Sequence, residues 1–113
     1  MSRWAVVLAG GVGSRFWPLS TAERPKQLLP LATDQPMLAD ALARLEPLVP
    51  AERTLVLTNA TLVEPIAALA PGIPRENLIA EPRPAGTAAA LAWAAHVIRR
   101  RAGDDAVMIS VHA

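Results

Sequence analysis

Four short apolar runs alternate with three helix-like segments along the chain, and this alternation limits the fold more than any other feature. Strands are predicted at Trp4–Leu8, Arg53–Thr58, Asn77–Ala80 and Ala106–Val111, and helices at Pro36–Leu45, Thr61–Ala70 and Thr87–Arg101. Strands that are joined in succession by helices form a parallel sheet with helices on both faces. The predicted fold class is therefore α/β, with three layers and a mainly parallel sheet.

Turn and cap residues predict how these elements begin and end. Asp34 is expected to cap the first helix and Thr87 the third, because short oxygen-bearing side chains bond the free N–H groups at a helix start. Gly103 is expected to close the third helix. The segment Pro25–Leu31 is apolar but interrupted by Pro30, and it is predicted to be extended.

A glycine-rich segment directly follows the first predicted strand and runs through Leu8, Ala9, Gly10, Gly11, Val12, Gly13, Ser14 and Arg15. Glycines lack a Cβ atom, so the backbone can approach phosphate oxygens and aim several N–H groups at them. The guanidinium of Arg15 can hold two phosphate oxygens at once. The spacing fits neither the dinucleotide-binding Gly-x-Gly-x-x-Gly motif nor the Walker loop, and a simple tight turn remains the alternative.

Lys26 is the single lysine among eleven basic residues. It lies between Pro25 and Gln27, eleven residues after Arg15. Phosphoryl transfer needs positive charge where negative charge develops, and Arg15 and Lys26 converging on a triphosphate would meet that need. A surface lysine is the alternative, and neighbouring Arg24 is interpreted as a solvated charge.

Glu81 leaves the third predicted strand, and Gly86 and Thr87 open the third predicted helix. This position is the carboxyl edge of a parallel sheet, beside the glycine-rich loop. The carboxylate of Glu81 could accept two hydrogen bonds from guanine, which presents adjacent N1–H and N2–H₂ donors, whereas adenine and uracil do not. Gly86 would permit close approach to the base. A solvated carboxylate at a strand end is the alternative.

Composition excludes several classes of partner and of binding site. The net charge is +1 with both signs mixed along the chain, so no basic stripe predicts a nucleic-acid partner. The chain has no cysteine, which excludes disulfides and thiolate metal sites. No apolar stretch is long enough to span a bilayer, and no targeting segment is visible, so the expected location is the cytoplasm without a membrane partner.

The motifs together resemble a known family. The run from Leu8 to Ser20, with its Trp-Pro-Leu-Ser ending, and the triplet Pro25-Lys26-Gln27 resemble the signature of the sugar-1-phosphate nucleotidyltransferases, in particular their mannose-1-phosphate guanylyltransferase branch. The resemblance covers the whole chain in order. It implies a Rossmann-like nucleotidyltransferase fold, of which residues 1–113 are the N-terminal nucleotide-binding portion, cut after the fourth strand.

The resemblance also implies a reaction, in which mannose 1-phosphate attacks the α-phosphorus of GTP with Mg²⁺ and gives GDP-mannose and pyrophosphate. It implies catalytic roles for Arg15, which would hold the leaving pyrophosphate, and Lys26, which would neutralise transition-state charge. The triphosphate would lie against the backbone of the glycine-rich loop, and the base near the third strand. These nucleotide-binding positions are Leu8, Ala9, Gly10, Gly11, Gly13, Glu81, Gly86 and Thr87. A homodimer of the longer protein is compatible with this expectation.

Two departures from the family pattern stand out. Ala85-Gly86 stands where the guanylyltransferase branch carries Arg-Asn, a few residues after Glu-Pro. This replacement makes the segment more similar to that of other sugar nucleotidyltransferases. The family's metal-binding Asp would follow Ala113, so the expectation is a fragment that is inactive alone and carries no metal ligand of its own.

Two alternatives stay open. The first is a sugar-1-phosphate nucleotidyltransferase that uses another nucleoside triphosphate or another sugar. The second is a non-catalytic nucleotide-binding module.

Overall fold

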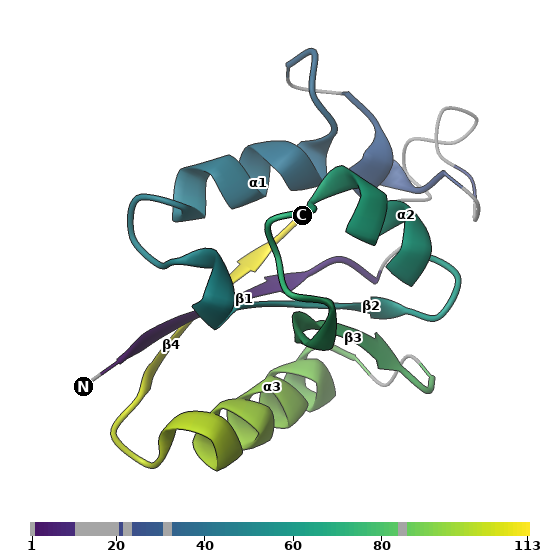
Figure 1. Cartoon of the computed structure of the whole chain (residues 1–113). Coiled ribbons are helices and arrows are strands. Elements are labelled where there is room, and N and C mark those ends of the chain that lie inside the picture. Colours follow the sequence, from purple (N-terminus) through teal and green to yellow (C-terminus); the bar gives the residue numbers. More distant parts are fainter. Residues whose placement is uncertain (1, 11–20, 22–23, 31–32, 84–85) are drawn as a thin grey trace.

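A four-stranded parallel sheet forms the centre of the computed structural model, which describes residues 2–10, 21, 24–30, 33–83 and 86–113 (Figure 1). Its strands are β1 (Arg3–Leu8), β2 (Thr54–Asn59), β3 (Leu78–Glu81) and β4 (Val107–His112). They lie in the order β3-β2-β1-β4, and every pairing is parallel. The α/β class predicted from the alternation is confirmed.

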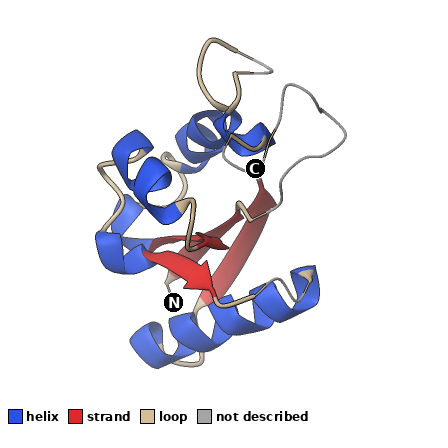
Figure 2. Cartoon of the chain, turned by 90° about the vertical axis from the view of Figure 1, so that its right-hand side faces the viewer, coloured by secondary structure: helices blue, strands red, loops and turns tan. Residues whose placement is uncertain are grey.

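Helices cover both faces of this sheet. α1 (Met37–Leu45) and α2 (Val63–Leu69) lie on one face, and α3 (Thr87–Ala102) lies alone on the other (Figures 1 and 2). Three short 3₁₀ helices join the larger elements: η2 (Lys26–Leu28), η3 (Ala51–Arg53) and η4 (Arg75–Asn77). All seven predicted strands and helices are present, and none of their ends differs from its prediction by more than two residues.

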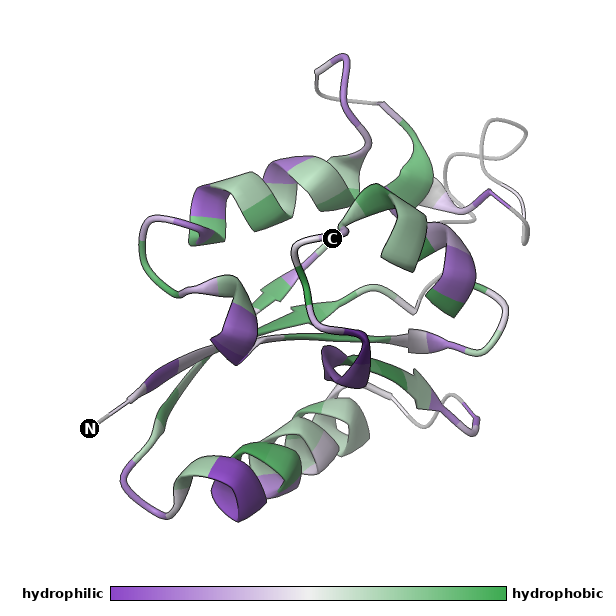
Figure 3. Ribbon diagram, viewed as in Figure 1, coloured by the Kyte–Doolittle hydropathy of each residue, from purple (hydrophilic) through white to green (hydrophobic). Residues whose placement is uncertain are grey.

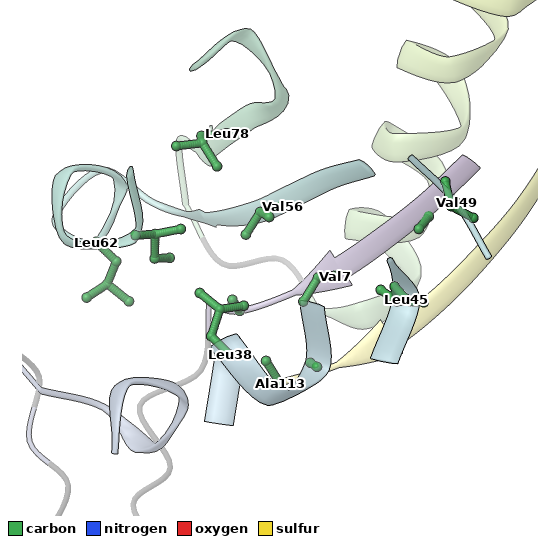
Figure 4. Close-up of a cluster of buried hydrophobic side chains, with 12 residues drawn as sticks. Val7, Leu38, Leu45, Val49, Val56, Leu62, Leu78 and Ala113 are labelled. Atoms are coloured by element: carbon green, nitrogen blue, oxygen red, sulfur yellow. The ribbon is translucent and has the colours of Figure 1, made fainter. Parts of the chain in front are cut away.

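β1 is one of the two inner strands, and its apolar side chains contribute to both halves of the core. Successive side chains of a strand point to opposite faces. Trp4 and Val6 therefore pack with the buried row of α3, whereas Ala5 and Val7 pack with α1 and α2. Figure 3 shows the apolar strands between the helical layers, and Figure 4 shows the cluster on the α1 and α2 side, which includes Val7.

The segment around Lys26 differs from its prediction. Lys26–Leu28 forms a 3₁₀ turn in which the Leu28 N–H donates to the Pro25 carbonyl at 2.9 Å, so the prediction of an extended segment over Pro25–Leu31 is wrong at its centre. Pro25 favours this turn because its ring holds φ near the helical value. The turn buries the side chain of Gln27 completely.

The predicted helix caps are also wrong, although Gly103 does close α3. α1 is preceded by Pro36 and α3 by Gly86, and neither helix start has a side-chain cap. Gly86 has φ of 93° and ψ of 169°, a backbone conformation that only glycine adopts easily, and this geometry makes Thr87 the first helical residue instead of the cap.

Buried Asn77 ties the amino end of β3 to its surroundings. Its Nδ2 donates to the carbonyls of Glu52 at 3.1 Å and Thr54 at 3.0 Å. Its Oδ1 accepts a hydrogen bond from Arg101 Nη1 at 2.6 Å. This side chain, at the end of η4 and directly before β3, therefore links η3, β2 and the last turn of α3.

Candidate nucleotide site

The strand order places a candidate site at the carboxyl ends of β1 and β4. From β1 the chain steps to β2 and β3 on one side, and then returns to β4 on the other side. Ligands of open α/β sheets bind outside the carboxyl ends of the strands at such a switch point. Leu8 is the last residue of β1 and pairs with Leu57 on one side and His112 on the other.

The chain leaves β1 through Ala9, whose backbone is hydrogen-bonded on both sides. The Ala9 N–H donates to the Leu57 carbonyl at 2.8 Å. The Ala9 carbonyl accepts from Thr58 Oγ1 and from Gln27 Nε2, both at 2.8 Å. The start of the glycine-rich loop is therefore fixed to β2 and to η2.

Gly10 follows Ala9 at the carboxyl edge of the sheet, where it is exposed and lies beside Glu81. A Cβ atom added to Gly10 would stand 3.9 Å from Glu81 Oε1 and 3.9 Å from the Cα of Thr58. Glu81 ends β3, pairs in register with Asn59, and is half-buried. The structure thus brings together two predicted site residues that lie far apart in the sequence.

The start of α3 adds Gly86 and Thr87 to this end of the sheet. Both residues are exposed, and the helix runs for 16 residues behind them. The first N–H groups of a helix lack intrahelical acceptors and carry partial positive charge, so they attract anions. Gly86 and Thr87 therefore lie where a negatively charged ligand is favoured.

Several predicted residues lie outside the described residues. These are Gly11, Gly13 and Arg15 of the glycine-rich loop, together with Ala85 before α3. The backbone of Lys26 opens η2, but its side chain is not among the described ones. Arg24 is exposed, as its interpretation as a solvated charge predicted.

Two buried side chains at this edge had no role in the sequence prediction. Gln27 was recognised only as part of a motif, and Thr58 only as the end of an apolar run. Their contact with Ala9 spans 18 and 49 positions of sequence, so no local spacing signals it. A weak signal for Thr58 is that a polar residue ends an otherwise apolar strand.

Among the described residues, no three histidine, aspartate or glutamate side chains lie close enough to hold a metal ion. A cavity of about 530 Å³ lies elsewhere, between the ends of α1 and α2, where Leu42, Val49, Thr54 and Leu69 line it. It opens near the start of β2, not near its carboxyl end, so it is separate from the candidate site. No helix of the described part is long and apolar enough to cross a bilayer.

The doubly wound parallel sheet, with a glycine-rich exit from β1 and a carboxylate at the end of β3, defines an α/β domain of the nucleotide-binding type. The chain belongs to the nucleotidyl transferase family, whose model matches residues 4–111. This confirms the family resemblance drawn from the glycine-rich and Pro-Lys-Gln motifs.

Individual relatives agree with this membership. The chain is 36% identical over 105 residues to a mannose-1-phosphate guanylyltransferase of Sinorhizobium fredii, covering 91% of this chain and 20% of the relative. It is 39% identical over 108 residues to mannose-1-phosphate guanylyltransferase 2 of Escherichia coli O157:H7, covering 93% and 22%.

The fold matches a crystal structure from Thermus thermophilus, described as a mannose-1-phosphate geranyltransferase, with a TM-score of 0.82 and 36% identity. That match covers 97% of this chain and 32% of the solved one. The chain thus spans about a fifth of the curated relatives and a third of the solved structure.

Proposed function

We propose that the protein at its natural length transfers GMP from GTP to mannose 1-phosphate, and that residues 1–113 form the nucleotide-binding portion of the domain that does so. The observation that carries this proposal is the approach of Glu81 to Gly10 at the carboxyl edge of the sheet. In this proposal Glu81 reads the base and the backbone of the glycine-rich loop binds the phosphates. The names of the matched relatives, which are mannose-1-phosphate guanylyltransferases, support this choice of reaction.

The chemistry needs little from the protein beyond placement of charge. An anionic oxygen of mannose 1-phosphate attacks the α-phosphorus of GTP. The bond from that phosphorus to the bridging oxygen breaks, and pyrophosphate leaves with the electron pair. Because the nucleophile is already anionic, no general base is required. In this proposal the backbone of Gly10, Gly11 and Gly13 cradles the triphosphate, Arg15 holds the leaving pyrophosphate, and Lys26 offsets charge on the α-phosphate.

Base selection is assigned to the half-buried carboxylate of Glu81. It would accept the N1–H and N2–H₂ donors of guanine, and such charge-assisted hydrogen bonds are stronger than neutral ones. Leu8 and Ala9 would lie against the nucleotide where β1 ends, and Gly86 and Thr87 would let the base approach the start of α3. Discrimination against adenine would follow because adenine presents one donor where guanine presents two, and a half-buried carboxylate oxygen left without a donor is costly.

A second candidate has its own support in the sequence. Ala85-Gly86 stands where the guanylyltransferase branch carries Arg-Asn, and this form is closer to that of other sugar nucleotidyltransferases. The alternative is therefore the same reaction class with another nucleoside triphosphate or another sugar.

Mg²⁺ is part of the proposal, since it would neutralise negative charge on the triphosphate when bound. Magnesium is commonly held by one or two carboxylates together with substrate phosphates and water. The proposal further includes a cytoplasmic location, where nucleoside triphosphates are available, and a homodimer.

A transferase assay tests this function. The protein at its natural length is incubated with Mg²⁺ and each of GTP, ATP, UTP and dTTP, against mannose 1-phosphate and glucose 1-phosphate, and pyrophosphate release is followed. GTP with mannose 1-phosphate should give the highest kcat/KM. Preference for another pair would support the second candidate, and no release with any pair would contradict both.

A further inference from the structure

The carbonyl of Ala9 receives two hydrogen bonds from side chains that are themselves buried. Thr58 is 1% exposed and Gln27 is 0% exposed, and each donates to this oxygen at 2.8 Å. Burying a polar side chain is unfavourable unless it is hydrogen-bonded. Two elements, β2 and η2, therefore each bury a polar group that bonds the same backbone atom.

The geometry of the peptide bond carries this restraint to Gly10. The peptide unit is planar and trans, so the Ala9 carbonyl and the Gly10 N–H point in opposite directions. Because the carbonyl points inward to Thr58 and Gln27, the Gly10 N–H points away from these buried donors. Gly10 itself is exposed at the edge of the sheet, beside Glu81.

The same hydrogen bonds also affect the strength of the donor. Hydrogen bonds in a chain polarise one another, and a carbonyl that accepts two bonds makes the N–H of its own peptide a better donor. The Ala9–Gly10 peptide is therefore both oriented and polarised before any ligand arrives. Preorganised backbone donors of this kind are effective because they need no rearrangement on binding.

We propose that Gln27 and Thr58 are positioning residues, which act through the Ala9 carbonyl so that the Gly10 N–H donates to a phosphate oxygen of the nucleoside triphosphate. This inference rests on the proposed function, because it takes the ligand of the loop to be a nucleoside triphosphate. Neither side chain contacts the nucleotide itself. Their contribution is the direction of one backbone N–H.

Thr54 provides a matched control on the same strand. It is 3% exposed, and its hydroxyl donates to the Pro50 carbonyl at 3.1 Å, at the opposite end of β2 from Thr58. Replacement of either threonine by valine removes one buried hydroxyl that bonds a backbone carbonyl. A purely structural role predicts the same consequences at both positions, whereas the positioning role does not.

Steady-state kinetics of the protein at its natural length separates the two roles. Thr58→Val should raise the KM for GTP about tenfold, the effect of losing one well-placed hydrogen bond, with kcat and the KM for the sugar phosphate nearly unchanged. Thr58→Ser should restore the KM because it keeps the hydroxyl, and Thr54→Val should leave the KM unchanged. Equal effects of Thr54→Val and Thr58→Val, or no effect of Thr58→Val, would overturn the inference.

A second measurement does not depend on turnover or on the fold of a variant. In the protein at its natural length, labelling with ¹³C′-alanine and ¹⁵N-glycine selects Ala–Gly peptides, of which residues 1–113 contain three, at Gly10, Gly86 and Gly103. Inorganic tripolyphosphate should move the Gly10 amide proton downfield, as a new hydrogen bond to phosphate does, and leave Gly103 in place. A Gly10 resonance that does not move at saturation would contradict the positioning role. Absent turnover in the wild type would instead contradict the proposed function.

Discussion

Gly10 and Glu81 face each other across the carboxyl ends of β1 and β3, with Glu81 Oε1 3.9 Å from the point where a Cβ of Gly10 would stand. That separation is an ordinary van der Waals contact, so the fold can accommodate a methyl group there. The space beside Glu81 is nevertheless the space that the proposed nucleotide occupies. Stability and ligand binding should therefore respond differently to a substitution at Gly10.

Gly10→Ala should keep or slightly raise stability while weakening GTP binding. Gly10 is not among the described glycines with positive φ, which are Gly86 and Gly103. Alanine at a compatible position stabilises by about 0.4–1 kcal/mol through the unfolded state. Calorimetry should show GTP binding weakened about tenfold, or about 1.4 kcal/mol. Unchanged GTP affinity would show that the nucleotide does not occupy the space between Gly10 and Glu81.

Gly86→Ala and Gly103→Ala form a matched pair at the two ends of α3. Gly86 has φ of 93° and Gly103 has φ of 91°, so alanine at either position adopts a strained backbone. Each should lower the free energy of unfolding in urea by about 1–3 kcal/mol. Only Gly86→Ala should also weaken GTP binding, since only Gly86 lies at the candidate site. Equal losses of GTP affinity in the two variants would contradict the assignment of Gly86 to the nucleotide site.

Glu81→Gln should relax the choice of base. A glutamine amide offers one acceptor oxygen and one NH₂ donor group where the carboxylate offers two acceptor oxygens. Guanine therefore loses one hydrogen bond, and one of its donors faces the NH₂ donor of the amide. The ratio of kcat/KM for GTP to that for ATP should fall about tenfold or more. Glu46→Gln, at an exposed position after α1, is the control and should leave the ratio unchanged. A constant GTP preference in Glu81→Gln would end the assignment of this residue.

Arg15→Ala and Lys26→Ala should lower turnover without a comparable loss of stability. Each removes a positive charge from the proposed triphosphate site, and the loss of one electrostatic stabiliser costs about a hundredfold in kcat. Arg24→Ala removes an exposed charge two positions before Lys26 and should be nearly silent. Turnover and thermal unfolding are measured on all three variants. Near-normal turnover in both test variants would contradict their catalytic roles.

Asn77→Ala should destabilise the fold by about 2 kcal/mol or more, because it leaves the carbonyls of Glu52 and Thr54 without their buried donor. Arg101→Met removes a partner whose own side chain is exposed, and it should cost less. Urea unfolding measures both. A smaller loss for Asn77→Ala than for Arg101→Met would contradict the network as described.

Strong periodic patterns made most of the fold predictable from the sequence. The apolar run around Val6 and Val7 is typical of a strand that is buried on both faces, and such a strand belongs at the centre of a parallel sheet. The start of α3 was less predictable. Thr87 has the chemistry of a cap, but the positive φ of Gly86 decides where the helix begins.

The site was predictable only where its residues form local motifs. Gly10 and Glu81 were predicted because each follows a strand at the same sheet edge. The bonds from Gln27 and Thr58 to Ala9 depend on how η2 and β2 pack, and tertiary packing of that kind leaves no sequence spacing. The 3₁₀ turn at Lys26–Leu28 had a local signal in Pro25, but the apolar residues around it favoured an extended segment in the sequence prediction.

The central claim is that mannose 1-phosphate attacks the α-phosphorus of GTP and takes up GMP with release of pyrophosphate, and ³¹P NMR of the products tests it most directly. The protein at its natural length is mixed with GTP, mannose 1-phosphate and Mg²⁺, and the phosphorus resonances are followed. The proposed reaction predicts the two coupled phosphorus resonances of GDP-mannose, a nucleoside diphosphate sugar, and one equivalent of pyrophosphate. Formation of GDP and inorganic phosphate, or unchanged substrates with folded protein, would contradict it.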